Sequence, residues 1–351
     1  MVPAGEYVAT SDVDMPDGVP PGQLTPGGDF GWLKKSYKWE ASGDAPAVES
    51  RGEWHGHNIV AADYGFQADA TLTEAPGGMY PSGSLSCISC HDPHGRYRRD
   101  DTGAISTTGK PIIASGSYTN SVDPDAKFAV GVYRLLGGIG YSPKSLGNHS
   151  FTDGPPAAVC PPNYNRPEDK TNTRVAYGSG MSEWCTNCHK AYLMKTPGTQ
   201  LHPAGNGIKF SSGIAANYNA YVSSGNLSGR QDTAYTSMVP FEMGTSDYSL
   251  LKKTANSDGS VTTGPDSNAN VMCLTCHRAH ASGWDKSTRW NMKTEMLVWN
   301  GDYAGKDRNG VPAQYSQGRM HAETKKTFYD RPANYYGIYQ RSLCNKCHAK
   351  D

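Results

Sequence analysis

The sequence lacks the features that would tie it to a membrane or to a polyanion. No apolar run in its 351 residues approaches the roughly 18 residues of a transmembrane helix, so we expect no membrane span. Lysine plus arginine and aspartate plus glutamate number 33 each. A balanced charge gives no reason to predict binding to nucleic acid or to an anionic membrane surface. Residues 1–5 show no charged and apolar signal segment.

Apolar residues are also scarce. They make up 36% of the chain, whereas a chain of this length normally carries about 45 to 50%. Glycine and proline are abundant instead, at 40 and 23 residues. This composition predicts a mostly coil fold with a few short helices and minimal strand. We expect a strand near residues 33–39, a helix over 126–136, and helices that start near Ser182, Ser212 and Ser246, the last two ending near Gly225 and Asn256.

Cysteine is rare but regularly placed. All of the 9 cysteines except Cys160 belong to four copies of the pattern Cys-x-x-Cys-His, and random placement would give roughly 0.007 copies. In this pattern two thiols add across the vinyl groups of a haem, and the histidine becomes an axial ligand of its iron. The sequence therefore predicts four covalently attached haem c groups. Their attachment residues are Cys87, Cys90, Cys185, Cys188, Cys273, Cys276, Cys344 and Cys347, and their proximal ligands are His91, His189, His277 and His348.

Other uses of paired cysteines fit the pattern less well. Two zinc ions could be held by four Cys-x-x-Cys pairs, but zinc does not require a histidine directly after every second cysteine. A thioredoxin-like redox pair would not be repeated four times. A disulfide framework leaves only Cys160 over, which we interpret as a free thiol, with intermolecular pairing as the alternative.

Haems would also resolve the shortage of apolar residues, because each is a large apolar plate that supplies core. The 21 tyrosines against 7 phenylalanines agree with this, since a tyrosine ring can pack on a porphyrin edge while its hydroxyl reaches water. The motifs are spread widely, from Cys87 to His348. We therefore expect one elongated tetrahaem unit over residues 1–351, whose residues 1–25 form an extended arm.

Seven histidines remain after the proximal four. His94 and His280 each follow a motif histidine by three residues and cannot easily reach over their own haem, so each would ligate a neighbouring haem. His57 and His202 lie beside glycine-containing turns, where the backbone can approach a ring closely. We predict His57, His94, His202 and His280 as distal ligands, with His321, His149 and His55 ranked after them. Methionine is the rival ligand and would raise the potential.

Several phrases of the sequence resemble one family closely. They are residues 25–32, 56–61, 90–95, 180–185, 202–207, 276–281 and 344–351. These phrases are similar to the outer-surface hexahaem c-type cytochromes of metal-reducing bacteria that polymerise into conductive filaments. The resemblance covers essentially the whole chain. It implies a bis-histidine haem chain, a mostly coil fold and extracellular electron transfer through polymers.

The chain also departs from that family. The family carries two more haem motifs at its N-terminus, and a histidine there ligates a haem in the neighbouring subunit. Tyr7 stands where the family places a ligand histidine, while His55, His149 and His321 are additions to the pattern. One of these additions could replace the missing donor. Because haem attachment takes place outside the cytoplasm, we expect a trimmed chain or a missing upstream portion.

The resulting prediction is an electron-transfer protein and not an enzyme. Its expected partners are identical subunits in a filament, upstream electron-donor cytochromes, and extracellular metal oxides or other cells as acceptors. The expected location is the outer cell surface. A discrete periplasmic or secreted tetrahaem carrier is the alternative. A multihaem reductase would need an open iron site with nearby proton donors, and the spare histidines argue against one.

Overall fold

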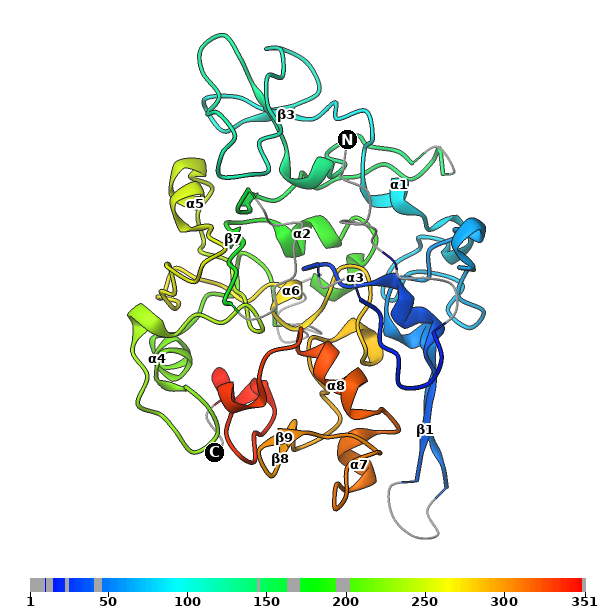
Figure 1. Cartoon of the computed structure of the whole chain (residues 1–351). Helices are drawn as coiled ribbons and strands as arrows, with labels where there is room; N and C mark the ends of the chain where they lie inside the picture. The colour runs from blue at the N-terminus through cyan, green and yellow to red at the C-terminus, as the bar shows by residue number, and fades with distance from the viewer. Residues whose placement is uncertain are drawn as a thin grey trace.

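The computed structural model describes residues 10, 15–22, 25–40, 46–143, 146–162, 171–193 and 203–348 (Figure 1). Within these ranges most of the backbone is loop. The longest helix described, α4, has 9 residues, and the longest strands described have 3. The fold class predicted from composition is confirmed: mostly coil, with a few short helices and minimal strand. Low apolar content is the reason, because few segments can bury a continuous face.

The helices are dispersed along the chain and few exceed two turns. The α-helices are α1 (Cys87–Cys90), α2 (Met181–Cys185), α3 (Lys190–Leu193), α4 (Ser212–Ala220), α5 (Tyr248–Thr254), α6 (Cys273–Cys276), α7 (Ala313–Ser316) and α8 (His321–Thr327). The 3-10 helices are η1 (Phe30–Lys34), η2 (Gly52–His55), η3 (Ala62–Tyr64), η4 (Ser82–Ser84), η5 (Tyr133–Leu135), η6 (Gln231–Thr233), η7 (Asp285–Ser287), η8 (Ala333–Tyr335) and η9 (Leu343–Lys346). Two of the α-helices, α1 and α6, coincide with Cys-x-x-Cys pairs.

The strands form small antiparallel sheets that serve as clips between loops. Their bounds are β1 (Tyr37–Trp39), β2 (Val48–Ser50), β3 (Arg98–Arg99), β4 (Ile105–Ser106), β5 (Val130–Gly131), β6 (Ala158–Val159), β7 (Ala176–Tyr177), β8 (Val298–Trp299) and β9 (Asp302–Tyr303). The pairs are β1-β2, β6-β7 and β8-β9, and one sheet has the order β4-β3-β5. In Figure 1 this three-stranded sheet lies at one end of the molecule and the β1-β2 hairpin at the other.

The helix predicted over residues 126–136 is wrong. Val130 and Gly131 instead form β5 and pair with Arg99 and Arg98 of β3. Val130 is β-branched, which favours an extended backbone, and a glycine weakens a helix interior. The 3-10 turn that follows is interrupted at Arg134, whose φ is 52°. Tertiary pairing therefore overrides the weak helical pattern.

The other predicted elements are confirmed in part. The strand near residues 33–39 is reduced to β1, because residues before it form η1, where the side chain of Asp29 accepts a hydrogen bond from the Gly31 N–H at 2.7 Å. Helix α2 starts one residue before Ser182. Helix α4 starts at Ser212 as predicted but ends at Ala220, five residues before Gly225. Helix α5 starts at Tyr248, two residues after Ser246, with Asp247 as its cap.

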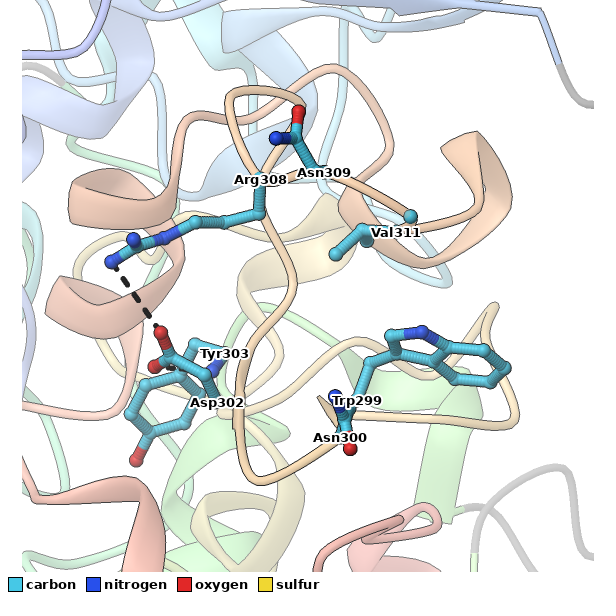
Figure 2. A pocket seen from close by; sticks show the side chains of 8 residues that line it. Trp299, Asn300, Asp302, Tyr303, Arg308, Asn309 and Val311 are labelled. Carbon is cyan, nitrogen blue, oxygen red and sulfur yellow. Dashed lines mark hydrogen bonds and ion pairs between the residues drawn. The ribbon is translucent and has the colours of Figure 1, made fainter.

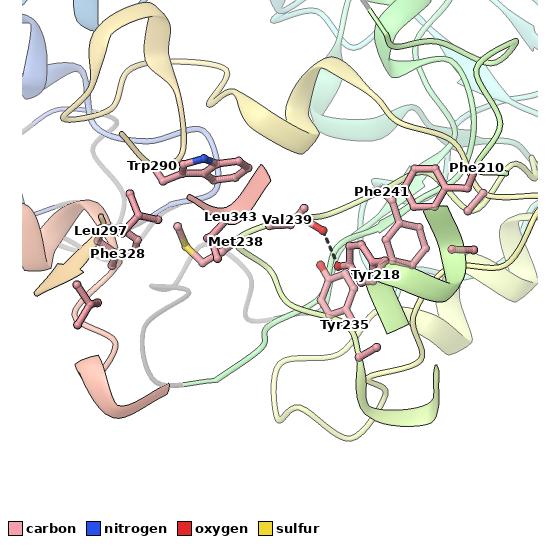
Figure 3. Packing of buried hydrophobic residues seen from close by; sticks show 14 of the residues in the cluster. Phe210, Tyr218, Tyr235, Met238, Val239, Phe241, Trp290, Leu297, Phe328 and Leu343 are labelled. Atoms are coloured by element: carbon pink, nitrogen blue, oxygen red, sulfur yellow. Dashed lines mark hydrogen bonds between the residues drawn. The ribbon is translucent and has the colours of Figure 1, made fainter. Parts of the chain in front are cut away.

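The largest hydrophobic cluster lies in the C-terminal half and is rich in aromatic side chains (Figure 3). The Tyr218 hydroxyl donates to the Val239 carbonyl at 2.7 Å, so this buried tyrosine packs its ring while satisfying its polar end. Cys276, Cys344 and Cys347 pack against the same cluster. The core cluster therefore packs against cysteines of two motifs, as expected if cofactors add to it.

A buried ion pair joins the N-terminal segment to the body. Lys35 Nζ lies 2.7 Å from Glu323 Oε1, with side chains 3% and 2% exposed, and it also donates to the Pro16 carbonyl at 2.8 Å. We expect Lys35→Met to reduce the free energy of unfolding by about 3 to 5 kcal/mol, because Glu323 loses its buried partner. Chemical denaturation measures this loss. The exposed Lys38→Met is the control and should change stability by at most about 0.5 kcal/mol.

Candidate haem sites

The four Cys-x-x-Cys-His motifs share one local geometry. In each, the backbone N–H of the histidine donates to the carbonyl of the first cysteine, four residues earlier, at 2.9 to 3.1 Å. These bonds are His91 to Cys87, His189 to Cys185, His277 to Cys273 and His348 to Cys344. In a helical turn, residues at positions 1, 4 and 5 lie on one face. Each motif therefore presents both sulfurs and its histidine toward the same side, as a single flat group would require.

Motifs that follow one another in sequence are also neighbours in space. The Cys185 thiol hydrogen-bonds the Cys273 thiol, and Ser182 Oγ accepts from the Cys273 N–H at 3.0 Å, which joins α2 to α6. Burial and then the nearby Cys90 thiol raise the pKa of Cys188 to about 12. Burial and then Cys344 and Cys347 raise the pKa of Cys276 to about 12. In a loaded cytochrome these sulfurs would be thioethers and would not titrate, but their proximity shows that consecutive motifs are neighbours in space.

Four histidines have their Nδ1 atom within hydrogen-bond distance of a backbone carbonyl. The Nδ1 atoms lie 2.7 to 2.9 Å from backbone carbonyls: His57 from Ala279, His91 from Arg134, His189 from Pro76 and His277 from Lys286. An Nδ1–H that donates to a carbonyl leaves the lone pair of the ring on Nε2, the atom that can bind a metal. Burial lowers the pKa of His57 to about 4 and also lowers those of His91 and His189. Neutral imidazole is the form that coordinates iron, so these residues fit the group.

Two histidine pairs lie close together. The ring centroids of His57 and His189 are 5.9 Å apart. Metal–nitrogen bonds of about 2 Å on opposite sides of one ion would give a centroid separation of roughly 6 Å. His280 lies near His91, which lowers its pKa to about 4 after burial as the larger cause. The His280 ring also stacks on Phe30 at 4.6 Å, which holds its orientation.

Two of the lower-ranked histidines use both ring nitrogens within the protein. His55 is fully buried, with Nδ1 3.0 Å from the Trp32 carbonyl and Nε2 2.8 Å from Ser50 Oγ. His321 has Nε2 2.8 Å from Asp302 Oδ1 and Nδ1 3.1 Å from Arg308. Neither ring keeps a free lone pair for iron in this arrangement. In this structure both rings are therefore held by hydrogen bonds to other parts of the protein.

We expect His55→Ala to cost about 2 to 4 kcal/mol of stability, because it leaves a cavity and unpaired buried groups. Burial and then Arg319 lower the pKa of His55, so below about pH 6.5 the unfolded chain binds a proton that the native chain does not. Stability therefore falls with acidity by at most about 1.4 kcal/mol per pH unit through this group. Denaturation from pH 7 to 5 should show a shallower slope in the variant. An equal slope would contradict this role.

For the remaining candidate haem ligands the structure shows fewer contacts to the imidazole ring. His94 is exposed, and its backbone N–H donates to Asp92 Oδ1 at 3.1 Å. His149 packs edge-on against Tyr80 at 4.9 Å, and its buried Nε2 has no hydrogen-bond partner among the described residues. His348 is exposed near the end of the described chain. His202 and Tyr7 lie outside the described residues.

Sequence reasoning missed the groups that orient the ring nitrogens. They are the backbone carbonyls of Pro76, Arg134, Ala279 and Lys286, and a carbonyl leaves no signal in residue type. Two of these positions are marked indirectly by strain, because Arg134 and Lys286 have φ values of 52° and 59°. The left-handed backbone turns each carbonyl toward a motif histidine. Such strain is typical of functional sites.

Three further features of the described residues concern bare-metal binding, the ninth cysteine and membrane insertion. No group of three or more His, Cys, Asp or Glu side chains in those ranges is arranged to hold a bare metal ion, as a zinc site would need. Cys160 is a buried free thiol whose Sγ donates to the Ser117 carbonyl at 2.9 Å. Nor do the described ranges contain a helix with the length and apolarity to cross a membrane.

Two surface pockets differ in their relation to the motifs. One, of about 290 Å³, is lined by Glu183, Thr186 and Lys190 beside the second motif. The other, of about 280 Å³, contains none of the motif residues. Figure 2 shows that an ion pair between Arg308 and Asp302, 3.4 Å long, closes one side of it opposite Trp299. Only the first pocket adjoins a proposed haem.

Comparison with known proteins shows the family to which the chain belongs. No family model matches the chain. The chain is 54% identical over 353 residues to the C-type cytochrome OmcS of Geobacter sulfurreducens, covering 99% of this chain and 81% of OmcS. Two solved structures, of OmcS nanowires and of the Outer Membrane Cytochrome S filament from the same organism, match with a TM-score of 0.90 and 54% identity over 97% of this chain and 84% of theirs. The chain therefore belongs to the OmcS family of c-type cytochromes.

Proposed function

We propose that this chain conducts electrons outside the cell through four haem c groups, as a subunit of a filament of identical chains. The single observation that carries the proposal is the proximity of consecutive motifs: Cys90 acts electrostatically on Cys188, Cys185 interacts with Cys273, and Cys344 acts electrostatically on Cys276. Haem c, when bound, supplies a reversible one-electron iron couple. Groups held in a contiguous row suit transfer along the chain and leave no need for a substrate pocket.

The histidine geometry supports specific axial pairs. We assign His57 as the distal ligand opposite His189, on the basis of the 5.9 Å between their rings. His280 is assigned opposite His91, on the basis of their electrostatic contact. His94 and His202 stay proposed distal ligands without an assigned partner, with His149 as the reserve donor. His55 and His321 are excluded because both of their ring nitrogens are engaged.

The protein's own contribution is to hold these ligands still. Carbonyls that accept from Nδ1 fix each ring's tautomer and raise the basicity of Nε2, which favours the oxidised iron and a low potential. Buried aromatic residues of the core cluster pack near Cys276, Cys344 and Cys347 and shield one side of the third and fourth motifs from water. Little rearrangement then accompanies each electron transfer. Rigid ligands and dry surroundings are what a conducting row of cofactors requires.

The filament assignment rests on the relatives. The matched structures are described as OmcS nanowires and as a filament, and the fold is shared at a TM-score of 0.90. His348 is exposed, so the fourth haem would lie near the surface, where a second subunit can approach it. Upstream donor cytochromes would supply electrons, and extracellular metal oxides or other cells would accept them.

Cryo-electron microscopy of the purified native protein, combined with a haem assay, tests this function. We expect filaments, four haems per chain and six-coordinate low-spin iron at every site. Isolated particles with four closed haems would instead indicate a discrete tetrahaem carrier. A five-coordinate haem would overturn the assignment of a pure electron conductor and reopen that of a reductase. Fewer than four haems per chain would refute the motif assignment.

A further inference from the structure

The fourth motif differs from the other three in charge. The two residues between its cysteines are Asn345 and Lys346, whereas the corresponding pairs elsewhere are Ile88 and Ser89, Thr186 and Asn187, and Leu274 and Thr275. Lys346 is the only ionisable residue among these eight. It is also buried, with 5% of its surface exposed. A lysine is rarely buried unless it is paired with a carboxylate, so its surroundings need an explanation.

The partners of the Lys346 ammonium are neutral. Nζ donates to the carbonyls of Tyr218 and Tyr221 at 3.1 and 2.9 Å, and it lies 4.3 Å from the centre of the Tyr218 ring. These carbonyls belong to the C-terminal end of α4, where the helix dipole attracts a cation. No ion pair among the described residues includes Lys346. The protein therefore holds this charge in place without neutralising it.

The same helix end fixes the position of the motif. Asn217 of α4 donates through Nδ2 to the Cys347 carbonyl at 3.4 Å, and Cys344 and Cys347 both pack against the core cluster. The ammonium is therefore tied to the segment that carries both thioether sulfurs. A charge in this low-dielectric setting acts more strongly than one in water.

We propose that Lys346 is a potential-setting residue, whose buried ammonium raises the reduction potential of the haem attached to Cys344 and Cys347. Reduction adds one electron to the ferric iron and gives the ferrous state, with no bond made or broken, so a nearby positive charge favours the reduced state. The inference rests on haem attachment at the fourth motif, as proposed above. Its consequence is that electrons settle preferentially at this exposed end of the row.

Potentiometric titration of the fully loaded protein at pH 6, followed by visible absorbance, tests the role of Lys346. In Lys346→Gln the amide can still donate to the two carbonyls but carries no charge. We expect one component of the titration to move to lower potential, with the equilibrium constant for its reduction falling on the order of tenfold, which corresponds to about 59 mV for a one-electron couple. The other components should move much less. Lys346→Arg should retain the wild-type titration.

Lys252→Met is the matched control, because Lys252 lies on α5 and pairs with Asp123 away from the fourth motif. It removes one positive charge and should leave every component in place. Lys346→Met serves as a second neutral variant if the glutamine variant does not fold. Unchanged potentials in a folded, fully loaded neutral variant, or an equal shift of all components, would overturn the proposal. A missing haem, detected by mass spectrometry in the wild type, would instead refute the attachment on which it rests.

Discussion

Replacing both Cys185 and Cys188 with serine is expected to remove one haem and to interrupt electron flow through the whole chain. The second motif lies between its neighbours, because Cys188 is beside Cys90 and Cys185 hydrogen-bonds Cys273. Without that haem, an electron entering at the first motif loses the acceptor next to Cys90. Mass spectrometry should show three haems in place of four, and conductance across the purified protein should fall by most of its value.

The ninth cysteine provides a matched control for this experiment. Cys160 is buried but belongs to no motif, and its thiol donates to the Ser117 carbonyl, which a serine hydroxyl can also do. Cys160→Ser should therefore keep all four haems and the full conductance. If the double serine variant lost its haem yet conducted as well as Cys160→Ser, electron transfer through a row of neighbouring motifs would be contradicted. A fall in both variants would point to general misfolding.

The candidate haem sites are predicted by the sequence because covalent attachment demands adjacent residues. Cys87 to His91 is recognisable without any knowledge of the fold, and so are the three later copies. The mostly coil architecture was equally predictable, because 36% apolar content with 40 glycines leaves few segments able to form a buried helical or sheet face. Local chemistry and composition are properties of the chain itself.

The sequence alone does not predict which motifs are neighbours in space. Nor does it predict which of the other histidines keep a ring nitrogen available for iron. His55 and His57 lie two residues apart and look equivalent in sequence. The structure separates them through distant partners, since His55 is enclosed by Trp32 and Ser50 while His57 contacts the Ala279 carbonyl. The helix predicted over residues 126–136 is wrong for the same reason, because Val130 and Gly131 pair with Arg99 and Arg98 in a sheet. Contacts between residues far apart in sequence decided each case.

Changing His57 to methionine is expected to raise the potential of one haem more than any other single substitution proposed here. The ring of His57 lies 5.9 Å from that of His189, and its Nδ1 is held by the Ala279 carbonyl at 2.7 Å. This leaves Nε2 for the iron that we propose the second motif would hold. A thioether in its place stabilises ferrous iron. Axial ligands span about 0.8 V among haem proteins, and we expect an upward shift on the order of 0.1 V in one component of a potentiometric titration.

Controls for the ligand prediction come from histidines that differ only in their contacts. His321→Met should leave the haem potentials unchanged, because Asp302 and Arg308 already occupy both nitrogens of His321. His57→Ala should go further than His57→Met and leave one iron five-coordinate, visible as a high-spin signal. If His57→Ala stayed fully low-spin while His321→Met changed the spectrum, the two assignments would have to be exchanged. His57 and His321 differ in whether Nε2 is already hydrogen-bonded. Comparing their variants therefore tests whether an available Nε2 is what makes a histidine a ligand.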